Sequence, residues 1–165
     1  MLRGTADVIL GLTIRACAPI RHDVESAKDI ICNCLAVRQA ARQLTQMYED
    51  ALAGTGLKAT QFSVLARLSQ IEPATMQELA DDLVMDRTTL SHNLKPLERD
   101  GFISIGVADG DQRVRRLSLT KSGKTTLKGA YKAWKGAQDR FEHAFGVKAA
   151  ADLRRELVRA VSVVS

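Results

Sequence analysis

The sequence predicts a mainly α-helical protein that carries one small β-hairpin, and three observations support this fold class. Apolar residues recur at helical spacing through most of residues 26–165. Residues 103–119 instead alternate apolar and polar side chains around Asp109-Gly110, a dipeptide suited to the positive backbone angles of a tight turn. A length of 165 residues suffices for one domain with a dimerisation element, and a net charge of +5 favours a polyanionic partner.

Residues 1–25 differ in character from the rest and are expected to form an N-terminal extension, either disordered or packed on a dimer. The apolar run at residues 8–14 is too short to cross a bilayer, and Arg15 follows it directly. Three cysteines are too few and too close together for a disulfide scaffold. We therefore expect a cytoplasmic protein with no membrane partner.

Residues 26–56 are predicted to form a dimerisation helix and the break that follows it. Ser26 can cap the helix with Asp29 three residues later, and Gly54-Thr55-Gly56 ends it. At about 1.5 Å per residue, a helix from Ser26 to Ala53 is on the order of 40 Å long. One small core cannot cover that length, so we expect a second subunit to cover it.

Three short helices are predicted between this first helix and the hairpin. One spans residues 60–70, and Pro73 ends the connection after it. Thr75 and Glu78 begin the next helix as a capping box, in which the threonine oxygen accepts from the third amide and the glutamate reaches back. Only the turn at residues 84–86 separates that helix from the third, and two helices joined so closely match a helix-turn-helix layout.

The third of these helices, residues 86–99, presents a polar and basic face. Leu90, Leu94 and Leu97 recur at i, i+4 and i+7, so they form its buried stripe. The side chains that point away from the stripe are Thr88, Ser91, His92, Lys95 and Arg99. None of them is a carboxylate, as a surface that meets a polyanion requires.

The end of this helix and the hairpin after it carry further signals. Pro96 cannot donate to the His92 carbonyl, so we expect a kink or an early loosening there. Gly101 reaches a left-handed C-terminal cap without steric cost. Arginines crowd the hairpin tip and return strand, at Arg113, Arg115 and Arg116. A basic helix beside an arginine-tipped ribbon suits a DNA duplex, which offers a wide groove next to a narrow one.

Residues 121–165 are predicted to form two helices that meet at Gly146 and contribute to dimerisation. Thr120 caps the first, and its aromatic stripe, which includes Tyr131 and Trp134, is more typical of a core than of a ligand site. The second has little else to cover it and is expected to pair with the first helix of the chain across a dimer. The histidines are dispersed, so we expect neither a metal site nor a cofactor.

The run D-Q-R-V-R-R-L-S-L-T at residues 111–120 is the most specific motif of the chain. It resembles the wing signature of the MarR family of winged helix-turn-helix transcription regulators, D-x-R followed after a short strand by L-T. The runs T-Q-F-S-V-L at residues 60–65, T-M-Q-E-L-A-D-D-L at residues 75–83 and L-K-P-L-E-R-D-G at residues 94–101 resemble the same family, in its order and at its spacing. The resemblance covers residues 29–145.

This resemblance implies that residues 57–120 form a winged helix-turn-helix DNA-binding domain and that the chain is an obligate homodimer. Such dimers bind a pseudo-palindromic double-stranded DNA operator, usually as repressors released by a small phenolic ligand or by cysteine oxidation. The resemblance also implies that Arg113 reaches the minor groove and that Asp111 holds the arginine-rich wing by an ion pair.

Nine residues are predicted to contact DNA or to order the elements that do. Thr88, Ser91 and His92 are the candidates for base edges, and Arg87 and Lys95 are the candidates for phosphates. The full set comprises Arg87, Thr88, Thr89, Ser91, His92, Lys95, Asp111, Arg113 and Arg115.

An effector cavity is implied by the same resemblance, between the first, second and fifth helices near the dimer interface. It would take a small aromatic ligand, and its residues here would be Arg38, Tyr48, Phe62 and Tyr131. Buried aromatic and apolar residues serve packing equally well, so both interpretations stand.

Cys34 supports an alternative, a redox- or peroxide-sensing regulator of the same fold. Counting back from Gln61, Cys34 falls where the organic-hydroperoxide-sensing branch of the family keeps its reactive cysteine, and Tyr48 falls where one tyrosine partner lies. Arg38 and Ala59 replace the other tyrosines of that branch. Arg38 is one turn from Cys34 and would favour a thiolate. A cysteine on an amphipathic helix is more often a small buried residue.

Two further classes of function remain open at this point. An enzyme with a nucleophilic cysteine would need a base within reach and an oxyanion site, and no motif supplies either, so we expect no catalysis. A winged-helix protein-interaction module would use its basic residues only for solubility. It would bind a partner protein and leave no operator footprint.

Overall fold

The computed structural model describes residues 32–108 and 111–164, and at positions 108 and 111–114 it describes the backbone alone. Its elements are α1 (Asn33–Leu52), α2 (Ala59–Ile71), β1 (Ala74–Thr75), α3 (Met76–Asp82), α4 (Arg87–Arg99), β2 (Ile103–Ala108), β3 (Asp111–Leu119), α5 (Lys121–Phe145) and α6 (Val147–Ser162). The mainly helical fold class is confirmed. The expected extension, residues 1–25, lies outside the described residues.

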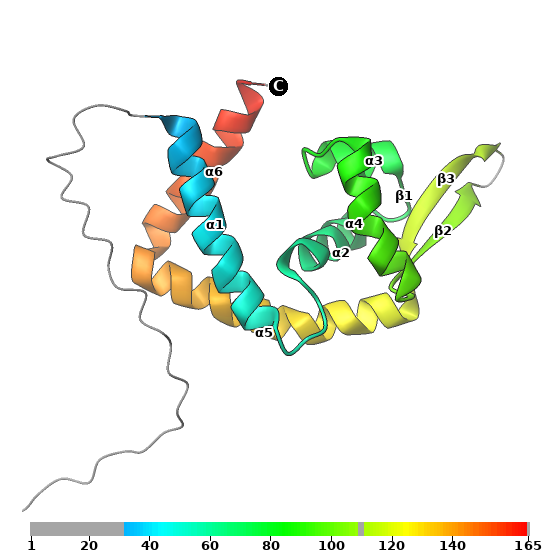
Figure 1. Cartoon of the computed structure of the whole chain (residues 1–165), viewed down its shortest axis with the longest axis horizontal. Helices are drawn as coiled ribbons and strands as arrows, with labels where there is room; N and C mark the ends of the chain where they lie inside the picture. The colour runs from blue at the N-terminus through cyan, green and yellow to red at the C-terminus, as the bar shows by residue number, and fades with distance from the viewer. Residues whose placement is uncertain (1–31, 109–110, 165) are drawn as a thin grey trace, which may run out of the picture.

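The long helix α5 connects the two ends of the molecule (Figure 1). At one end lie α1 and α6, and at the other end lie α2, α3, α4 and the sheet. The core belongs to the second end, where α2, α4 and the sheet bury residues such as Leu65, Leu68, Leu90 and Leu117. The elements that carry the basic helix and the hairpin are therefore built on the best-packed part of the described chain.

α1 begins at Asn33, so the prediction that this helix starts at Ser26 is wrong. Cys32 is extended and caps the helix, since its sulfur accepts from the Leu35 amide at 3.4 Å. A thiol is a weaker cap than a hydroxyl, which is why the sequence favoured the serine upstream. Ser26 itself lies outside the described residues. The 20 residues of α1 span about 30 Å, less than predicted.

The helix-turn-helix elements form as the sequence predicts. In the capping box of α3, the Glu78 amide donates to Thr75 Oγ1 at 3.1 Å and the Thr75 amide donates to Glu78 Oε2 at 2.6 Å. α3 also contacts α2 through the guanidinium of Arg67, whose Nε donates to Asp82 Oδ2 at 2.6 Å. Because α2 and α3 are tied in this way, α4 packs against a fixed support.

α4 continues through Pro96 to Arg99, so the expected early loosening is not observed. Proline removes only one backbone donor, and the Pro96 carbonyl still accepts from Asp100 at 2.9 Å. The predicted cap at Gly101 is confirmed, with φ +72°. The amides of Gly101 and Phe102 donate back into the last turn, at 3.0 and 2.8 Å, in a Schellman motif.

The sheet has three antiparallel strands in the order β1-β3-β2, one more than the predicted hairpin. β1 is only two residues long, and its Ala74 and Thr75 pair with Leu117 and Arg116 of β3. Two residues leave no alternating pattern in the sequence, so this strand escaped prediction. It matters because it joins the hairpin to the start of α3.

The start of α5 packs directly on the chain that leaves α4. Thr120 caps α5 as predicted, since its Oγ1 accepts from the Gly123 amide at 3.0 Å, and it also donates to the Gly101 carbonyl at 2.6 Å. Gly123 is buried, and a Cβ at this position would lie 2.0 Å from the Phe102 carbonyl oxygen. Only glycine permits this approach of helix and backbone.

We predict that Gly123→Ala lowers the free energy of unfolding by about 1–3 kcal/mol, because the added methyl group overlaps a backbone atom. Gly129→Ala on the same helix is the matched control, since nothing lies within 4 Å of a Cβ there. That change should raise the free energy of unfolding by about 0.5–1 kcal/mol through helix propensity. Urea denaturation measures both, and equal effects of the two substitutions would contradict the packing argument.

Candidate nucleic-acid interface

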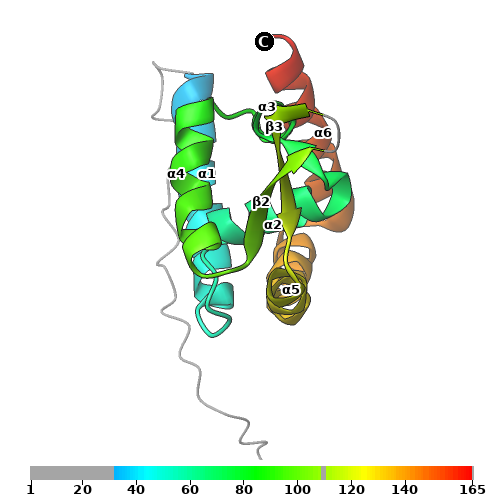
Figure 2. The same ribbon diagram turned by 90° about the vertical axis from the view of Figure 1, so that its right-hand side faces the viewer.

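α4 and the hairpin lie side by side on one face of the molecule (Figure 2). The leucine stripe of α4 is buried as predicted, with Leu90, Leu94 and Leu97 between 0% and 2% exposed. Asp86 caps the helix, since its Oδ1 accepts from the Thr89 amide at 2.8 Å. The polar face of α4 is thereby turned away from the core, beside the hairpin.

The residues predicted on α4 to contact DNA are mostly accessible. Arg87, Thr88, His92 and Lys95 are exposed, and Ser91 is half-buried. Thr89 is exposed as well, but its hydroxyl donates to Asp86 Oδ2 at 2.6 Å. Thr89 therefore takes part in the cap that fixes the first turn of α4.

The side chains of Arg115 and Arg116, on the return strand, point to opposite sides of the sheet. Arg115 is exposed, whereas Arg116 is half-buried and points back toward α3, where it pairs with Glu78 at 3.2 Å. Arg116 lies on the return strand as expected, but it does not share the direction of Arg115, because neighbouring residues of a strand face opposite sides of the sheet. The side chains of Asp111 and Arg113 lie outside the described residues.

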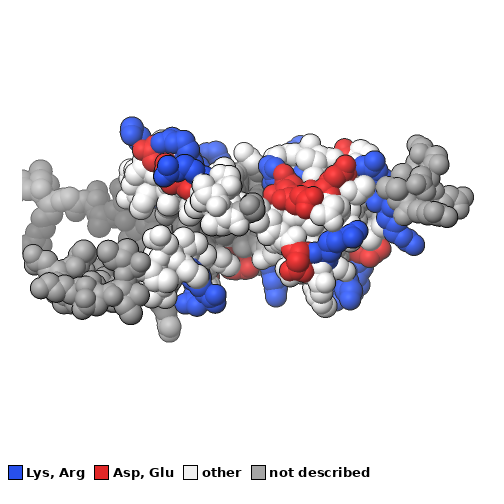
Figure 3. Space-filling model, turned by 90° about the horizontal axis from the view of Figure 1, so that it is seen from above, with Lys and Arg blue, Asp and Glu red and all other residues white. Residues whose placement is uncertain are grey.

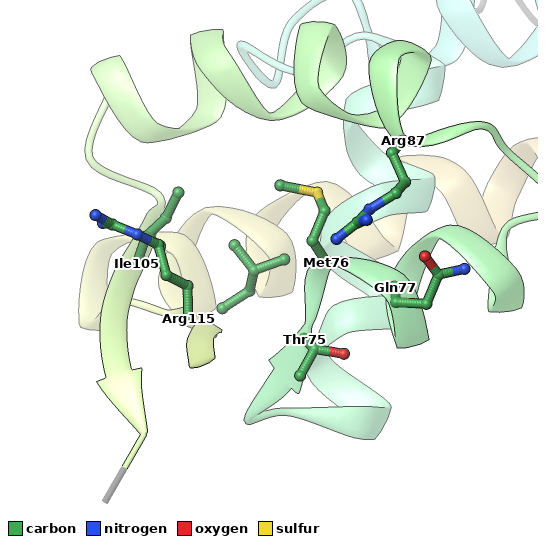
Figure 4. Close-up of a pocket in the computed structure, with 7 residues that line it drawn as sticks. Thr75, Met76, Gln77, Arg87, Ile105 and Arg115 are labelled. Carbon is green, nitrogen blue, oxygen red and sulfur yellow. The ribbon is translucent and has the colours of Figure 1, made fainter. Parts of the chain in front are cut away.

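A groove of about 580 Å³ separates the helix-turn-helix elements from the sheet (Figure 4). Arg87 points into it from the start of α4, and Arg115 lies on its opposite wall, on β3. Its lining residues are Thr75, Met76, Gln77, Arg87, Ile105, Arg115 and Leu117. An anionic chain could pass between two guanidinium groups over a largely apolar floor.

Thr75, Met76 and Gln77 were absent from the sites predicted by sequence. The capping box located the start of α3, but the proximity of that start to Arg115 depends on the pairing of β1 with β3, which carried no sequence signal. The contribution of α3 to the groove is therefore a finding of the structure.

Charges near the groove are distributed unevenly (Figure 3). Acidic side chains gather over α3, and Lys and Arg side chains border the wing tip. The α3 carboxylates have partners: Glu78 pairs with Arg116, Asp82 with Arg67, and Asp81 accepts from Gln77. Among the described residues, no ion pair engages Arg87 or Arg115.

Hydrogen bonds lower the pKa of two carboxyl groups at this face. The pKa of Asp86 falls chiefly because the Thr89 hydroxyl donates to it, followed by the Thr89 amide. The pKa of Glu78 falls chiefly through the Thr75 amide, with a smaller part from the charge of Arg116. Both groups are ionised at neutral pH, as caps of α4 and α3.

Known proteins share this fold. The sequence model of the MarR family matches residues 57–114. The transcriptional regulator MosR of M. tuberculosis, solved in complex with DNA, is 37% identical, with a TM-score of 0.73 over 81% of this chain and 96% of that chain. The chain belongs to the MarR family.

Two other members of this comparison are more distant. The transcriptional repressor CouR, solved on a 23-mer DNA duplex, is 25% identical, with a TM-score of 0.68 over 81% of this chain and 92% of CouR. The organic hydroperoxide resistance transcriptional regulator of Bacillus subtilis is 28% identical over 90 residues, 54% of this chain and 61% of that protein. The match spans less than two thirds of the length of the curated relatives.

The residues that the MarR resemblance assigned to an effector cavity are only partly brought together. Phe62 is buried and stacks on Trp134 at 5.6 Å, and Tyr131 lies 5.4 Å from the same indole ring. Tyr48 donates instead to the Gln138 side chain, and Arg38 is exposed on α1. The groove described above contains none of these residues, and neither does a second cavity beside α2, near Lys58 and Arg99. Phe62 is part of the core cluster of the single chain.

Both described cysteines are exposed at the start of α1. Cys34 is therefore not part of the core of the single chain. Cys32 is the cap of α1 rather than a residue within it. Among the residues that the structure describes, no cluster of His, Cys, Asp and Glu could hold a metal ion, and no helix has the length and apolarity to span a bilayer.

We predict that acidification loosens the first turn of α4 only below the ordinary carboxyl pKa of 3.8. A carboxyl whose pKa is lowered in the folded state stabilises it at higher pH, and that contribution disappears as pH falls through the folded pKa. In an NMR titration, the Asp86 carboxyl and the Thr89 amide should change together below pH 3.8. Asp86→Asn, which keeps a capping acceptor, should abolish the step. A midpoint for Asp86 at or above 3.8 would contradict the cap.

Proposed function

We propose that this protein is a sequence-specific DNA-binding transcriptional regulator that acts as a homodimeric repressor on a pseudo-palindromic operator. The observation that carries the proposal is the placement of the exposed face of α4 and of Arg115 on either side of one groove. A duplex presents its major groove to a helix and its neighbouring minor groove to a ribbon, with a phosphate strand between them. In this protein α4, the groove lined by Arg87 and Arg115, and the hairpin would face the major groove, the phosphate strand and the minor groove in the same order.

Each surface residue then has a role in the complex. His92, Thr88 and the half-buried Ser91 face base edges from the first turns of α4. Arg87 and Lys95 contact phosphates, which position the protein without reading sequence. The related MosR and CouR were both solved with DNA, and CouR is described as a repressor.

Dimerisation is supported by the apolar side chains left exposed on α1 and α6. Leu35 and Val37 of α1 are each 48% exposed, and Val158 of α6 is 71% exposed. A single chain that left these side chains in water would lose the stabilisation their burial provides, about 1.5–3 kcal/mol for each large one. We assign this surface to a second copy of the chain, as two-fold symmetric operators require.

Selection of bound duplexes from a random pool tests the proposal as a whole. The protein should enrich a sequence with two inverted half-sites, centred about one helical turn or a multiple of it apart. Its affinity for that duplex should fall steeply with salt, and the complex should contain two chains. If the bound duplexes show no enriched sequence, the proposal is wrong, and a winged-helix module that binds protein is favoured.

We predict that Arg113→Ala weakens binding to the selected operator by roughly 10- to 100-fold, because a groove-bound arginine contributes about 1–3 kcal/mol. This role rests on the likeness of the D-Q-R motif to the family wing signature. Arg140→Ala, at an exposed position of α5, is the control and should change affinity little. Fluorescence anisotropy at fixed salt measures both, with melting temperature as the check on folding. Equal affinities of the two variants would refute the assignment.

Peroxide-dependent release is the second candidate, because Cys34 is exposed on α1 and a relative from Bacillus subtilis is an organic hydroperoxide resistance regulator. Oxidation of Cys34 would add polar atoms to the surface assigned to the dimer. We predict that an organic hydroperoxide lowers operator affinity at least about tenfold, a change of about 1.4 kcal/mol. Cys34→Ser should abolish the response, and Cys32→Ser is the neighbouring control. An affinity that peroxide leaves unchanged would remove this candidate and leave a small-molecule ligand.

A further inference from the structure

Arg116 occupies a different position from the other arginines of the return strand. In register it lies between Thr75 of β1 and Gly106 of β2, in the middle of the three-stranded sheet. Its Nη1 donates to the Pro73 carbonyl at 3.3 Å and to Glu78 Oε2 at 3.2 Å. Arg115, the preceding residue, faces the groove. Adjacent arginines of one strand thus have separate environments.

The Glu78 oxygen that Arg116 contacts is also the one that caps α3. Oε2 accepts from the Thr75 amide at 2.6 Å and from Arg116 at 3.2 Å. One carboxylate oxygen therefore joins the first turn of α3 to the middle of β3. A change in the position of β3 would pull on the same atom that fixes the start of the helix-turn-helix elements.

Leu117 and Ile103 pack the sheet against the core, but few polar side-chain contacts hold it at this point. β1 contributes only two residues to the pairing with β3. At the end of β3, Glu72 accepts from the Leu119 amide at 2.6 Å and pairs with Lys124 at 2.8 Å, which fixes the strand where it enters α5. Between that point and the tip, the contact of Arg116 with Glu78 is the polar side-chain tie from β3 to α3 among the described residues.

We infer that Arg116 is a positioning residue for operator binding: through Glu78 it sets the angle between the hairpin and α4, and it does not itself touch DNA. This inference rests on the proposed function, since it concerns how the two DNA-contacting elements engage one duplex together. With the tie in place, Arg115 and the hairpin tip meet the minor groove while α4 occupies the major groove.

The tie acts on geometry more than on stability. The Arg116 side chain is 38% exposed and that of Glu78 is 56% exposed, so solvent screens the pair and the core does not depend on it. Loss of the tie should leave the fold intact and leave the hairpin free to change its angle. The cost then appears on DNA, where a misplaced wing must be ordered during binding.

Three substitutions separate this role from direct contact. Arg116→Met removes the guanidinium and keeps an unbranched side chain. Glu78→Gln removes the charge and keeps an oxygen for the capping box, which accepts glutamine equally. Arg115→Met is the matched control, an adjacent arginine on the groove side of the same strand. Each variant is tested as the full chain on the duplex selected above.

We expect Arg116→Met to bind about 5-fold more weakly, the effect of losing one solvent-exposed ion pair, with an unchanged salt dependence. Glu78→Gln should also weaken binding, although removal of a negative charge near DNA would on its own strengthen it. The double variant should be no weaker than Arg116→Met alone, since both changes break one contact. Arg115→Met should instead reduce the slope of log K against log salt by about 0.9.

Footprinting distinguishes positioning from a general loss of structure. In Arg116→Met, protection of the minor groove beside each half-site should decrease, while interference at guanine N7 in the major groove stays as in the wild type. A flattened salt slope for Arg116→Met, unchanged affinity, additive effects with Glu78→Gln, or uniform loss of protection would each overturn the inference. Should Arg116→Met unfold, Glu78→Gln carries the same footprint test. If the wild-type chain selects no duplex, the proposed function itself is wrong.

Discussion

Burial of the leucine stripe on α4 is the constraint on which the interface depends. Leu90, Leu94 and Leu97 are removed from water almost completely, and each contributes about 1.5–3 kcal/mol on folding. Rotation of α4 about its axis would expose all three at once. The direction of the opposite face is therefore fixed by packing, and His92 and Lys95 need no interaction of their own to be held toward a partner.

Capping at both ends of α4 further fixes the orientation of this helix. Asp86 and the Schellman motif at Gly101 satisfy backbone groups that a helix otherwise leaves open. The backbone is strained in the turn before α4, since Val84 adopts φ +53°, a conformation that favours glycine. Such a residue costs on the order of 1–3 kcal/mol and persists only where its surroundings impose it. Here the Met85 amide donates to Ala80 at 2.9 Å, which closes the turn.

Sequence reasoning succeeded where one residue type has one local physical role. The capping residues Thr75 and Thr120 and the glycine cap at Gly101 were all found in this way, because each acts within a few residues of itself. The leucine stripe was found from spacing alone. The polar face of α4 then followed from geometry, since residues not in the stripe must point elsewhere.

What escaped prediction depends on contacts between distant segments. β1 is too short to show a pattern, so neither the third strand nor the approach of α3 to Arg115 was anticipated. Arg116 looked like its neighbours in sequence, and only the sheet reveals that it faces α3. The cap of α1 at Cys32 was missed because helical spacing in the sequence continues upstream of it. For β1 and Arg116, the residue that determines the structure lies far away in sequence, where periodicity and capping patterns give no information.

The distance between the proposed DNA-contacting and dimer-forming elements gives α5 a mechanical role. Its 25 residues span about 38 Å, so in a dimer formed by α1 and α6 this helix sets how far apart two copies of α4 lie. A polar chain fixes its far end: Tyr48 of α1 donates to Gln138, Gln138 donates to Glu142 at 2.7 Å, and Arg154 of α6 pairs with Glu142 at 3.0 Å. The near end is fixed by the contact of Gly123 with the Phe102 carbonyl. An effector that tilts α1 or α6 would move each α4 through a helix held at both ends. In the proposed dimer, half-site spacing is set by the pitch of the duplex, so such a movement would take one of the two α4 helices out of its groove.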